Sequence, residues 1–193
     1  MLLWQGMGAA VAITEDRAQG LFDRLRSLPI PRSAVLSGRA VADTAMLIWG
    51  LLIMTIVSFL VGFRLHDGVA NGLIAFALII VFGFAFEWVF IATGLYASNA
   101  QAAQGLALIM VPFTFVSSAY VPVSSMPGWL QVVAAHQPVT YMIEAVRTLT
   151  GGSGAEALLG HPAPFYVVRS LVWSAVIVLV FATISVARYR RGE

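Results

Sequence analysis

Apolar residues fall in long runs along this chain, and short polar segments separate the runs. The stretch 44–63 contains no charged residue, and the stretch 69–97 contains one, Glu87. About 20 predominantly apolar residues in a helix cross the hydrocarbon core of a bilayer. The pattern therefore predicts an all-α integral membrane protein with four spans, which cover residues 44–63, 69–97, 105–123 and 166–187.

The first 13 residues are also apolar, but they are too few to span a bilayer. As a helix they reach about 20 Å, whereas the hydrocarbon core is about 30 Å thick. They carry no basic residue and no polar cleavage context, so they make a poor signal peptide. We interpret residues 1–13 as a partial span, with the chain beginning inside a transmembrane helix; a short half-buried helix is the alternative.

The most strongly charged segment is residues 14–43, which hold 9 of the 20 charged residues, five of them arginine. Apolar side chains recur at helical spacing within it, which predicts a short amphipathic helix over residues 15–28 with Thr14 as its N-cap. The apolar stripe consists of Ala18, Leu21, Phe22, Leu25 and Leu28.

Prolines end this predicted helix at Pro29 and Pro31, and Ser33 can begin another helix that continues into the span 44–63. The sequence therefore predicts a surface helix joined by a proline elbow to a transmembrane helix. Two functions stay open for the surface helix. It rests on lipid head groups, or it binds a groove on a partner domain as a coupling helix.

Arginine placement predicts the orientation of the chain. Five arginines lie in the segment 14–43, and the C-terminal tail adds three more: Arg188, Arg190 and Arg191. The opposite side of the membrane holds Arg64, Arg147 and Arg169. By the positive-inside rule, the loop 14–43 and the C-terminus face the cytoplasm, and an even number of spans between them agrees with this.

Prolines also interrupt the apolar residues 105–140, at Pro112, Pro122, Pro127 and Pro138. Irregular backbone at membrane depth is tolerated only where protein or a cavity covers it. We therefore expect residues 124–165 to form an outer re-entrant region, with short helices near 127–136 and 139–150.

The composition excludes several kinds of function. Only 10% of the residues are charged, against about 25% in soluble domains, and no basic patch interleaved with aromatic residues suggests nucleic acid. The absence of cysteine excludes disulfides and thiolate metal sites. The sequence has no phosphate-binding loop, no Ser/His/Asp arrangement and no metal-ligand spacing. We expect no catalytic residue, metal or cofactor on this chain.

Glu87 lies about 15 Å from the cytoplasmic end of its predicted helix, near the bilayer midplane. A charge there costs at least ~2.5 kcal/mol on the insertion scale, so such residues are functional hypotheses. Glu87 could lie on the substrate path, as a site for a cationic amphiphile or as a gate. The alternative is a protonated or hydrogen-bonded glutamate packed between helices.

Two segments resemble a known family. In the loop, the matching residues are Glu15, Asp16, Gly20, Asp23, Arg24, Leu28, Pro29, Arg32, Leu36, Gly38 and Arg39. In the predicted outer region, they are Pro122, Met126, Pro127, Trp129, Gln137, Pro138, Ala145, Arg147 and Gly151. Together they resemble ABC-2-type transporter permeases, above all the daunorubicin-resistance-type drug exporters of actinomycetes.

This resemblance implies a single ABC-2-type transmembrane domain over residues 1–193, in a bacterial plasma membrane. It implies a helical bundle of six spans per subunit, so that the first span would lie upstream of Met1. The expected partners are the lipid bilayer, a second permease copy as a homodimer, and a cytoplasmic ATP-binding cassette ATPase that carries ATP and Mg. The residues expected to couple to that ATPase are Glu15, Asp16, Arg17, Gly20, Leu21, Phe22, Arg24, Leu25 and Pro29.

The expected function is a permease that exports a hydrophobic substrate, a drug, an antibiotic or a lipid-like molecule. Two alternatives stay open. One is export of polysaccharide or lipid, because the helices do not reveal the chemistry of a substrate pocket. The other is a membrane scaffold that docks a soluble partner and transports nothing.

Overall fold

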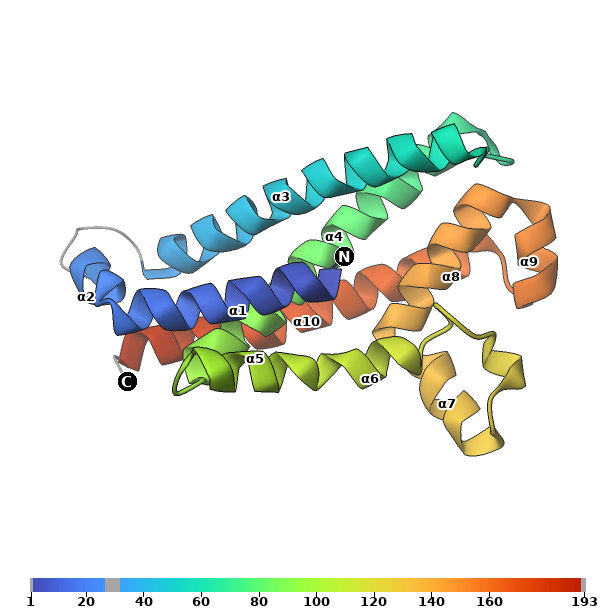
Figure 1. The fold of residues 1–193 in the computed structure, drawn as a ribbon. Helices are drawn as coiled ribbons and strands as arrows, with labels where there is room; N and C mark the ends of the chain where they lie inside the picture. Colours follow the sequence, from blue (N-terminus) through green and yellow to red (C-terminus); the bar gives the residue numbers. More distant parts are fainter. Residues whose placement is uncertain (1, 27–31, 192–193) are drawn as a thin grey trace. The chain divides into compact units, whose positions relative to one another are not determined.

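The structure is a computed structural model that describes residues 2–26 and 32–191. Every regular element in these residues is a helix (Figure 1). In chain order they are α1 Leu2–Ala18, α2 Leu21–Arg26, α3 Arg32–Val61, α4 Gly68–Tyr96, α5 Ala100–Leu108, α6 Met110–Phe115, the 3-10 helix η1 Val123–Ser125, α7 Gly128–His136, α8 Pro138–Gly151, α9 Ser153–Leu159 and α10 Ala163–Arg191.

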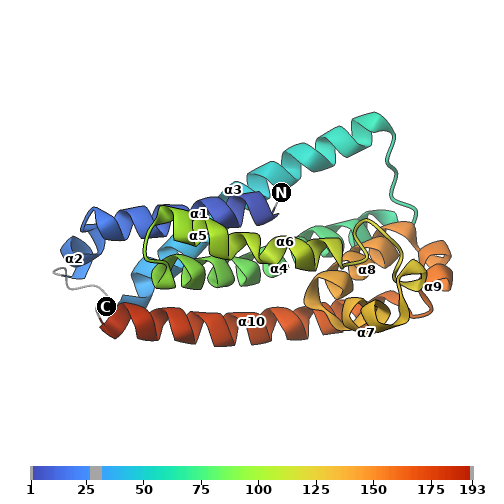
Figure 2. The same cartoon turned by 60° about the horizontal axis from the view of Figure 1, so that its bottom comes forward.

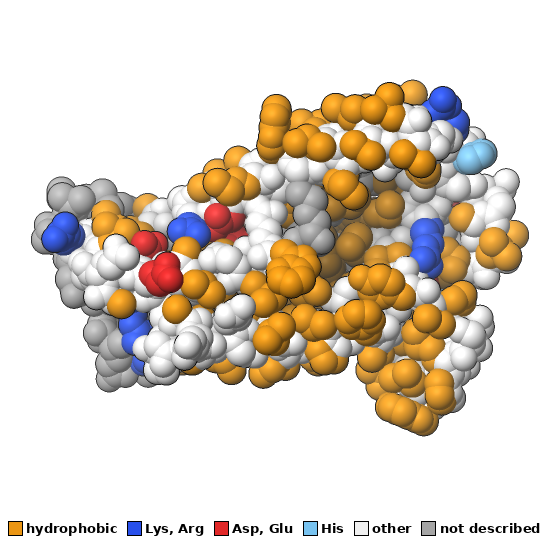
Figure 3. All heavy atoms as spheres, in the orientation of Figure 1, with side chains coloured by type: hydrophobic (Ala, Val, Ile, Leu, Met, Phe, Trp, Pro, Cys, Tyr) orange, Lys and Arg blue, Asp and Glu red, His pale blue; other side chains and the backbone are white. Residues whose placement is uncertain are grey.

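Three helices in the described part of the chain are long and apolar enough to cross a membrane: Ala34–Val61, Gly68–Tyr96 and Ala163–Tyr189. They confirm the prediction of an all-α, multi-pass membrane protein. The apolar surface agrees with it, because hydrophobic side chains lie outside along α3 (Figure 3). Trp49, Leu60 and Val61 on this helix are 68%, 81% and 83% exposed, which is unfavourable in water and suits lipid.

The apolar stretch 105–123 forms two short helices in place of one long one. The break falls at Ile109, between α5 and α6. Pro112 accounts for it, because proline has no N–H to donate to the carbonyl four residues earlier, and its ring crowds that carbonyl. Beyond Phe115 the chain turns irregularly until η1, so the helix does not continue.

The chain folds into two compact units. Unit 1 comprises Met1–Ile48, Gly83–Val111 and Ala175–Glu193, and within it α1 packs along α5, as both views show (Figures 1 and 2). Its main core cluster consists of Ile13, Leu36, Ala40, Trp88, Ile91, Leu95 and Tyr189. This cluster joins α1, α3, α4 and α10.

Unit 2 comprises Trp49–Phe82 and Pro112–Ser174. Its core cluster consists of Ala75, Leu78, Tyr141, Ala145, Leu149 and Tyr166. The short helices predicted near 127–136 and 139–150 are present as α7 and α8. The second ends as expected at Gly151, because Gly152 adopts a φ of 63° that favours glycine.

The charged segment begins differently from its prediction. Thr14 lies inside α1, which runs on to Ala18, so it caps no helix. A turn at Gly20, with φ of 71°, separates α1 from the short helix α2. The predicted helix over 15–28 is therefore divided between α1 and α2, and Leu28 and the elbow prolines Pro29 and Pro31 lie outside the described residues.

Candidate functional site

The last turns of α1 are fixed to the C-terminal end of α4. Arg17 donates a hydrogen bond from Nη1 to the carbonyl oxygen of Leu95, at 2.8 Å. The final carbonyls of a helix lack partners within it and carry the negative end of the helix dipole, so a guanidinium is favourable there. One predicted coupling residue is thus a fixed link between two helices.

Close backbone contact holds the same two helices together one turn earlier. The hydroxyl of Thr14 lies 3.0 Å from the carbonyl oxygen of Gly94 and 2.9 Å from that of Ala10. A Cβ atom added to Gly94 would lie 2.5 Å from the carbonyl oxygen of Ala10, which is too close for two atoms that are not bonded. The small residues on both helices are therefore required for this contact.

A chain of charged side chains continues from α1 to α3. Arg39 Nη1 lies 3.6 Å from Asp16 Oδ2, and Arg39 Nε donates to Asp43 Oδ2 at 2.7 Å. Gln5 on α1 donates to the backbone carbonyl of Asp43. The end of α1 is thereby connected to the first turns of α3 through a guanidinium that is only partly exposed.

Glu87 lies at the buried end of this chain of charges. Glu87 is 7% exposed and Asp43 is 9% exposed. Glu87 interacts electrostatically with both Asp43 and Arg39. Its Oε1 atom has no hydrogen-bond partner among the residues that the structure describes. We refer to Asp16, Arg39, Asp43 and Glu87 as the charge relay, since they connect the end of α1 with the middle of α4.

Asp16 and Glu87 were predicted from the sequence as separate features, and Arg39 and Asp43 were not among the predicted site residues. The spacing of Arg39 and Asp43 in the sequence did indicate that these two residues could pair. An arginine and an aspartate four residues apart lie on the same face of a helix. What the sequence could not show was that α1 and α4 approach this face from two sides.

The other predicted coupling residues lie around the turn between α1 and α2. Glu15, Leu21 and Arg24 are exposed, whereas Leu25 packs against the core cluster of unit 1. Figure 3 shows acidic and basic side chains gathered over this end of unit 1. The side chain of Phe22 and the whole of Pro29 lie outside what the structure describes.

The described residues contain no group of three or more His, Cys, Asp or Glu side chains that could hold a metal ion. The charge relay pairs carboxylates with a guanidinium, and no hydroxyl or imidazole lies within it as a nucleophile or base. The arrangement connects three helices through polar contacts, so a displacement of the end of α1 can pass to α3 and α4.

The chain is similar in sequence to a known protein family and to several of its members. The pattern that defines the ABC-2 type transporter family matches residues 1–150. The chain is 32% identical over 180 residues to the daunorubicin resistance ABC transporter permease protein DrrB1 of Streptomyces coeruleorubidus, covering 93% of this chain and 61% of that relative. It is 30% identical over 184 residues to the probable doxorubicin resistance ABC transporter permease protein DrrC of Mycobacterium tuberculosis, covering 95% of this chain and 64% of that relative.

A more distant match is the putative transport permease ycf38 of Porphyra purpurea, 28% identical over 145 residues, which are 73% of this chain and 49% of that protein. The chain thus spans about three fifths of the length of the first two relatives. Since the family pattern covers well over half of the sequence, this chain belongs to the ABC-2 type transporter family.

Proposed function

We propose that this chain is the transmembrane permease subunit of an ATP-binding cassette exporter. It moves a hydrophobic substrate, a drug, an antibiotic or a lipid-like molecule, out of the cell with ATP and Mg bound and hydrolysed on a separate subunit. The observation that carries this proposal is the charge relay. It connects the charged end of α1, beside α2, with two membrane-length helices. The names of the relatives, permeases of daunorubicin and doxorubicin resistance, support the same class of substrate.

The coupling mechanism follows from the contacts within unit 1. When two ATPase domains close on ATP, they push on α2 and the end of α1 from the cytoplasm. Arg17 passes that displacement to α4 through the Leu95 carbonyl, and Asp16 passes it to α3 through Arg39. A second copy of the permease completes the transport pathway as a homodimer.

The test replaces Leu21, which is exposed at the start of α2, together with the neighbouring Phe22. We expect the double substitution Leu21→Asp with Phe22→Asp to abolish co-purification with the ATP-binding cassette ATPase proposed as its partner, because two added charges oppose an apolar contact. ATP-driven efflux from proteoliposomes should stop as well. Val132→Asp is the matched control, since Val132 is 64% exposed and lies in unit 2 outside the cavity lining; it should bind the ATPase normally.

The proposal is wrong if the double variant still binds the ATPase at the wild-type ratio and transports normally. A wild-type chain that binds the ATPase but moves no substrate would support the scaffold alternative. A panel of drugs, lipids and polysaccharide precursors in the same vesicles separates the substrate classes.

A further inference from the structure

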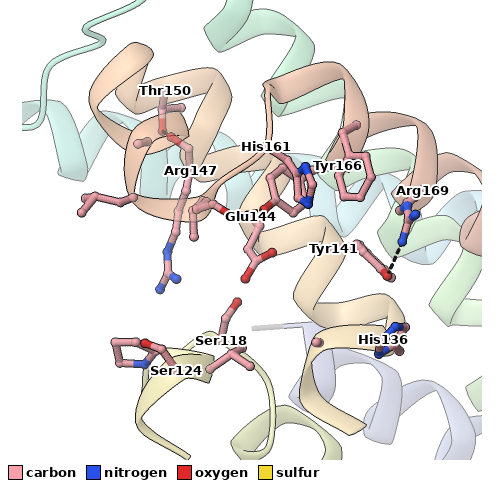
Figure 4. A pocket seen from close by; sticks show the side chains of 17 residues that line it. Ser118, Ser124, His136, Tyr141, Glu144, Arg147, Thr150, His161, Tyr166 and Arg169 are labelled. Atoms are coloured by element: carbon pink, nitrogen blue, oxygen red, sulfur yellow. Dashed lines mark hydrogen bonds between the residues drawn. The ribbon is translucent and has the colours of Figure 1, made fainter. Parts of the chain in front are cut away.

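Unit 2 contains a cavity that the proposed coupling mechanism does not use. Its volume is about 850 Å³, and its walls come from the segment after α6, the end of α7, α8, α9 and the start of α10 (Figure 4). Ionisable side chains line it on several sides: His136, Glu144, Arg147, His161 and Arg169.

Ser118 provides an unsatisfied hydroxyl in the cavity wall. The residue is 2% exposed, and its Oγ atom has no hydrogen-bond partner among the described residues. Its backbone N–H donates to Thr140 Oγ1 at 3.3 Å, so the residue itself is held in place. In Figure 4 the Ser118 hydroxyl points towards Glu144 across the cavity. A buried hydroxyl without a partner is costly, so a polar group that reaches it gains a hydrogen bond.

Arg169 is fixed in the wall by three contacts. It donates from Nη1 to the hydroxyl of Tyr141 at 2.8 Å. Its guanidinium carbon lies 4.1 Å from the ring centroid of Phe165 and 5.3 Å from that of Tyr141. These contacts leave several N–H groups of the guanidinium for another acceptor, since arginine has five in a rigid fork.

Arg147 lies one turn along α8 from Glu144, and both side chains extend into the cavity in Figure 4. The lining contains two guanidinium groups, those of Arg147 and Arg169, and one carboxyl, that of Glu144, so it has an excess of positive charge. Burial raises the pKa of Glu144, and Arg147 lowers it.

The lining also has an apolar part. It consists of Pro122, Val123, Leu158, Leu159 and Phe165, among others. Tyr166 is held by a hydrogen bond from its hydroxyl to the Leu159 carbonyl, at 2.8 Å. The cavity therefore combines a cationic polar part with surface that suits a hydrocarbon chain.

From this geometry we propose that the cavity of unit 2 binds the acidic head group of an amphiphile, a phosphate or a carboxylate. Arg147 contacts the anion, the Ser118 hydroxyl donates to it, and the apolar lining contacts the adjoining chain, while Arg169 adds positive charge from another side of the cavity. A membrane lipid and an exported acidic molecule share this chemistry. The inference goes beyond the proposed function, because it requires no assumption about what is exported.

The test measures lipid retention by native mass spectrometry on the full chain with its ATPase, purified in detergent. The probes are dioleoylphosphatidylglycerol, which is acidic, and dioleoylphosphatidylcholine, which is zwitterionic. We expect wild type to retain the acidic lipid in preference, and Arg147→Gln to lower its retention at least five-fold. Arg147→Lys should keep most of it, and Ser118→Ala should lower it by a smaller factor.

Arg64→Gln is the matched control. Arg64 is an exposed arginine of unit 2 outside the cavity lining, bonded to the carbonyls of Phe59 and Phe63, so its variant should retain the acidic lipid within two-fold of wild type. Equal retention of both lipids, or equal effects of Arg147→Gln and Arg64→Gln, would overturn the proposal. Displacement of the lipid by millimolar inorganic phosphate would overturn it as well, since it would assign the site to a free anion.

If Arg147→Gln does not fold, the milder Ser118→Ala variant still decides the outcome. Unchanged retention in that variant, together with no preference for the acidic lipid in wild type, would contradict the proposal. Binding of the ATPase, measured in the same spectra, reports on the proposed function separately.

Discussion

Arg39 shares its guanidinium between two carboxylates, that of Asp16 at the end of α1 and that of Asp43 one turn further along α3. A lysine has a single charged point on a flexible stem and would not hold both in one geometry. The position of the end of α1 therefore depends on a planar side chain that belongs to another helix. At the scale of single residues, this ion pair connects the end of α1 to the first turns of α3.

Glu144 leads to a prediction about pH. Burial raises its pKa in the folded protein above the ordinary value that the unfolded chain retains. Its contribution to stability is therefore lost as the pH rises from the ordinary pKa through the raised one, and it is recovered on acidification. We expect Glu144→Gln to raise the midpoint of thermal unfolding relative to wild type at pH 7, and by less at pH 5. Differential scanning fluorimetry of the solubilised chain measures this, and an equal difference at both pH values would contradict it.

Some of these residues could be predicted from the sequence, and others could not. Asp16 and Arg17 belong to a charged segment that is visible in the sequence, and the structure places both where helices meet. Ser118 is one of many serines, and only its burial against Thr140, 22 residues away, makes its hydroxyl unusual. Such a residue has no local signal, because its significance comes from segments that only folding brings together.

At the scale of elements, α1 and α4 approach each other closely through small residues. A Cβ atom added at Gly94 on α4 would clash with the backbone of Ala10, and a Cβ atom added at Gly6 on α1 would clash with the ring of Phe90. Packing of this kind leaves no room for an added methyl group next to backbone atoms, because neither helix can yield without moving as a whole.

We therefore expect Gly94→Ala to lower the free energy of unfolding by about 1–3 kcal/mol, the usual range for overpacking. The matched control is Gly105→Ala on α5, where an added Cβ meets nothing within 4 Å. That substitution should be neutral or stabilise by about 0.5–1 kcal/mol, because alanine favours the helix. Thermal unfolding of both variants in one detergent makes the comparison. Similar effects of the two would show that the α1–α4 contact is looser than the structure has it.

The elements themselves were largely predictable from the pattern of apolar residues and prolines. Prolines mark the starts of α7 and α8, and glycines mark the end of α8, at the positions where the structure has them. The predicted cap at Thr14 was wrong, because its hydroxyl contacts the Gly94 carbonyl, 80 residues away, in place of starting a helix. Local propensity favours a cap at threonine, and a tertiary contact overrides it here.

At the scale of the whole molecule, the buried position of Glu87 leads to a prediction about transport. If cationic substrates pass near the charge relay, Glu87→Gln should reduce efflux of a cationic dye from proteoliposomes. A tenfold reduction corresponds to the loss of ~1.4 kcal/mol of interaction. A neutral dye of similar size is the control and should be exported at the wild-type rate. Unchanged efflux of the cationic dye would assign Glu87 to packing alone.

Composition was enough to predict the class of the molecule, since a chain with 10% charged residues and helix-length apolar runs belongs in a bilayer. The division into two compact units was not predicted. It cuts across α3, α4 and α10, each of which begins in one unit and ends in the other. Hydropathy records how long a helix is, but it carries no information about where along its length a helix changes neighbours.

The length of α3 has a mechanical consequence. Its 30 residues form one uninterrupted helix, which makes a rod of about 45 Å. If such a rod tilts by about 5° around its far end, simple geometry moves the near end by about 4 Å, roughly three quarters of the rise of one helical turn. Arg39, near the beginning of α3, connects this helix to Asp16 on α1. A small tilt of the helix around its far end therefore moves Arg39 over a comparatively long distance.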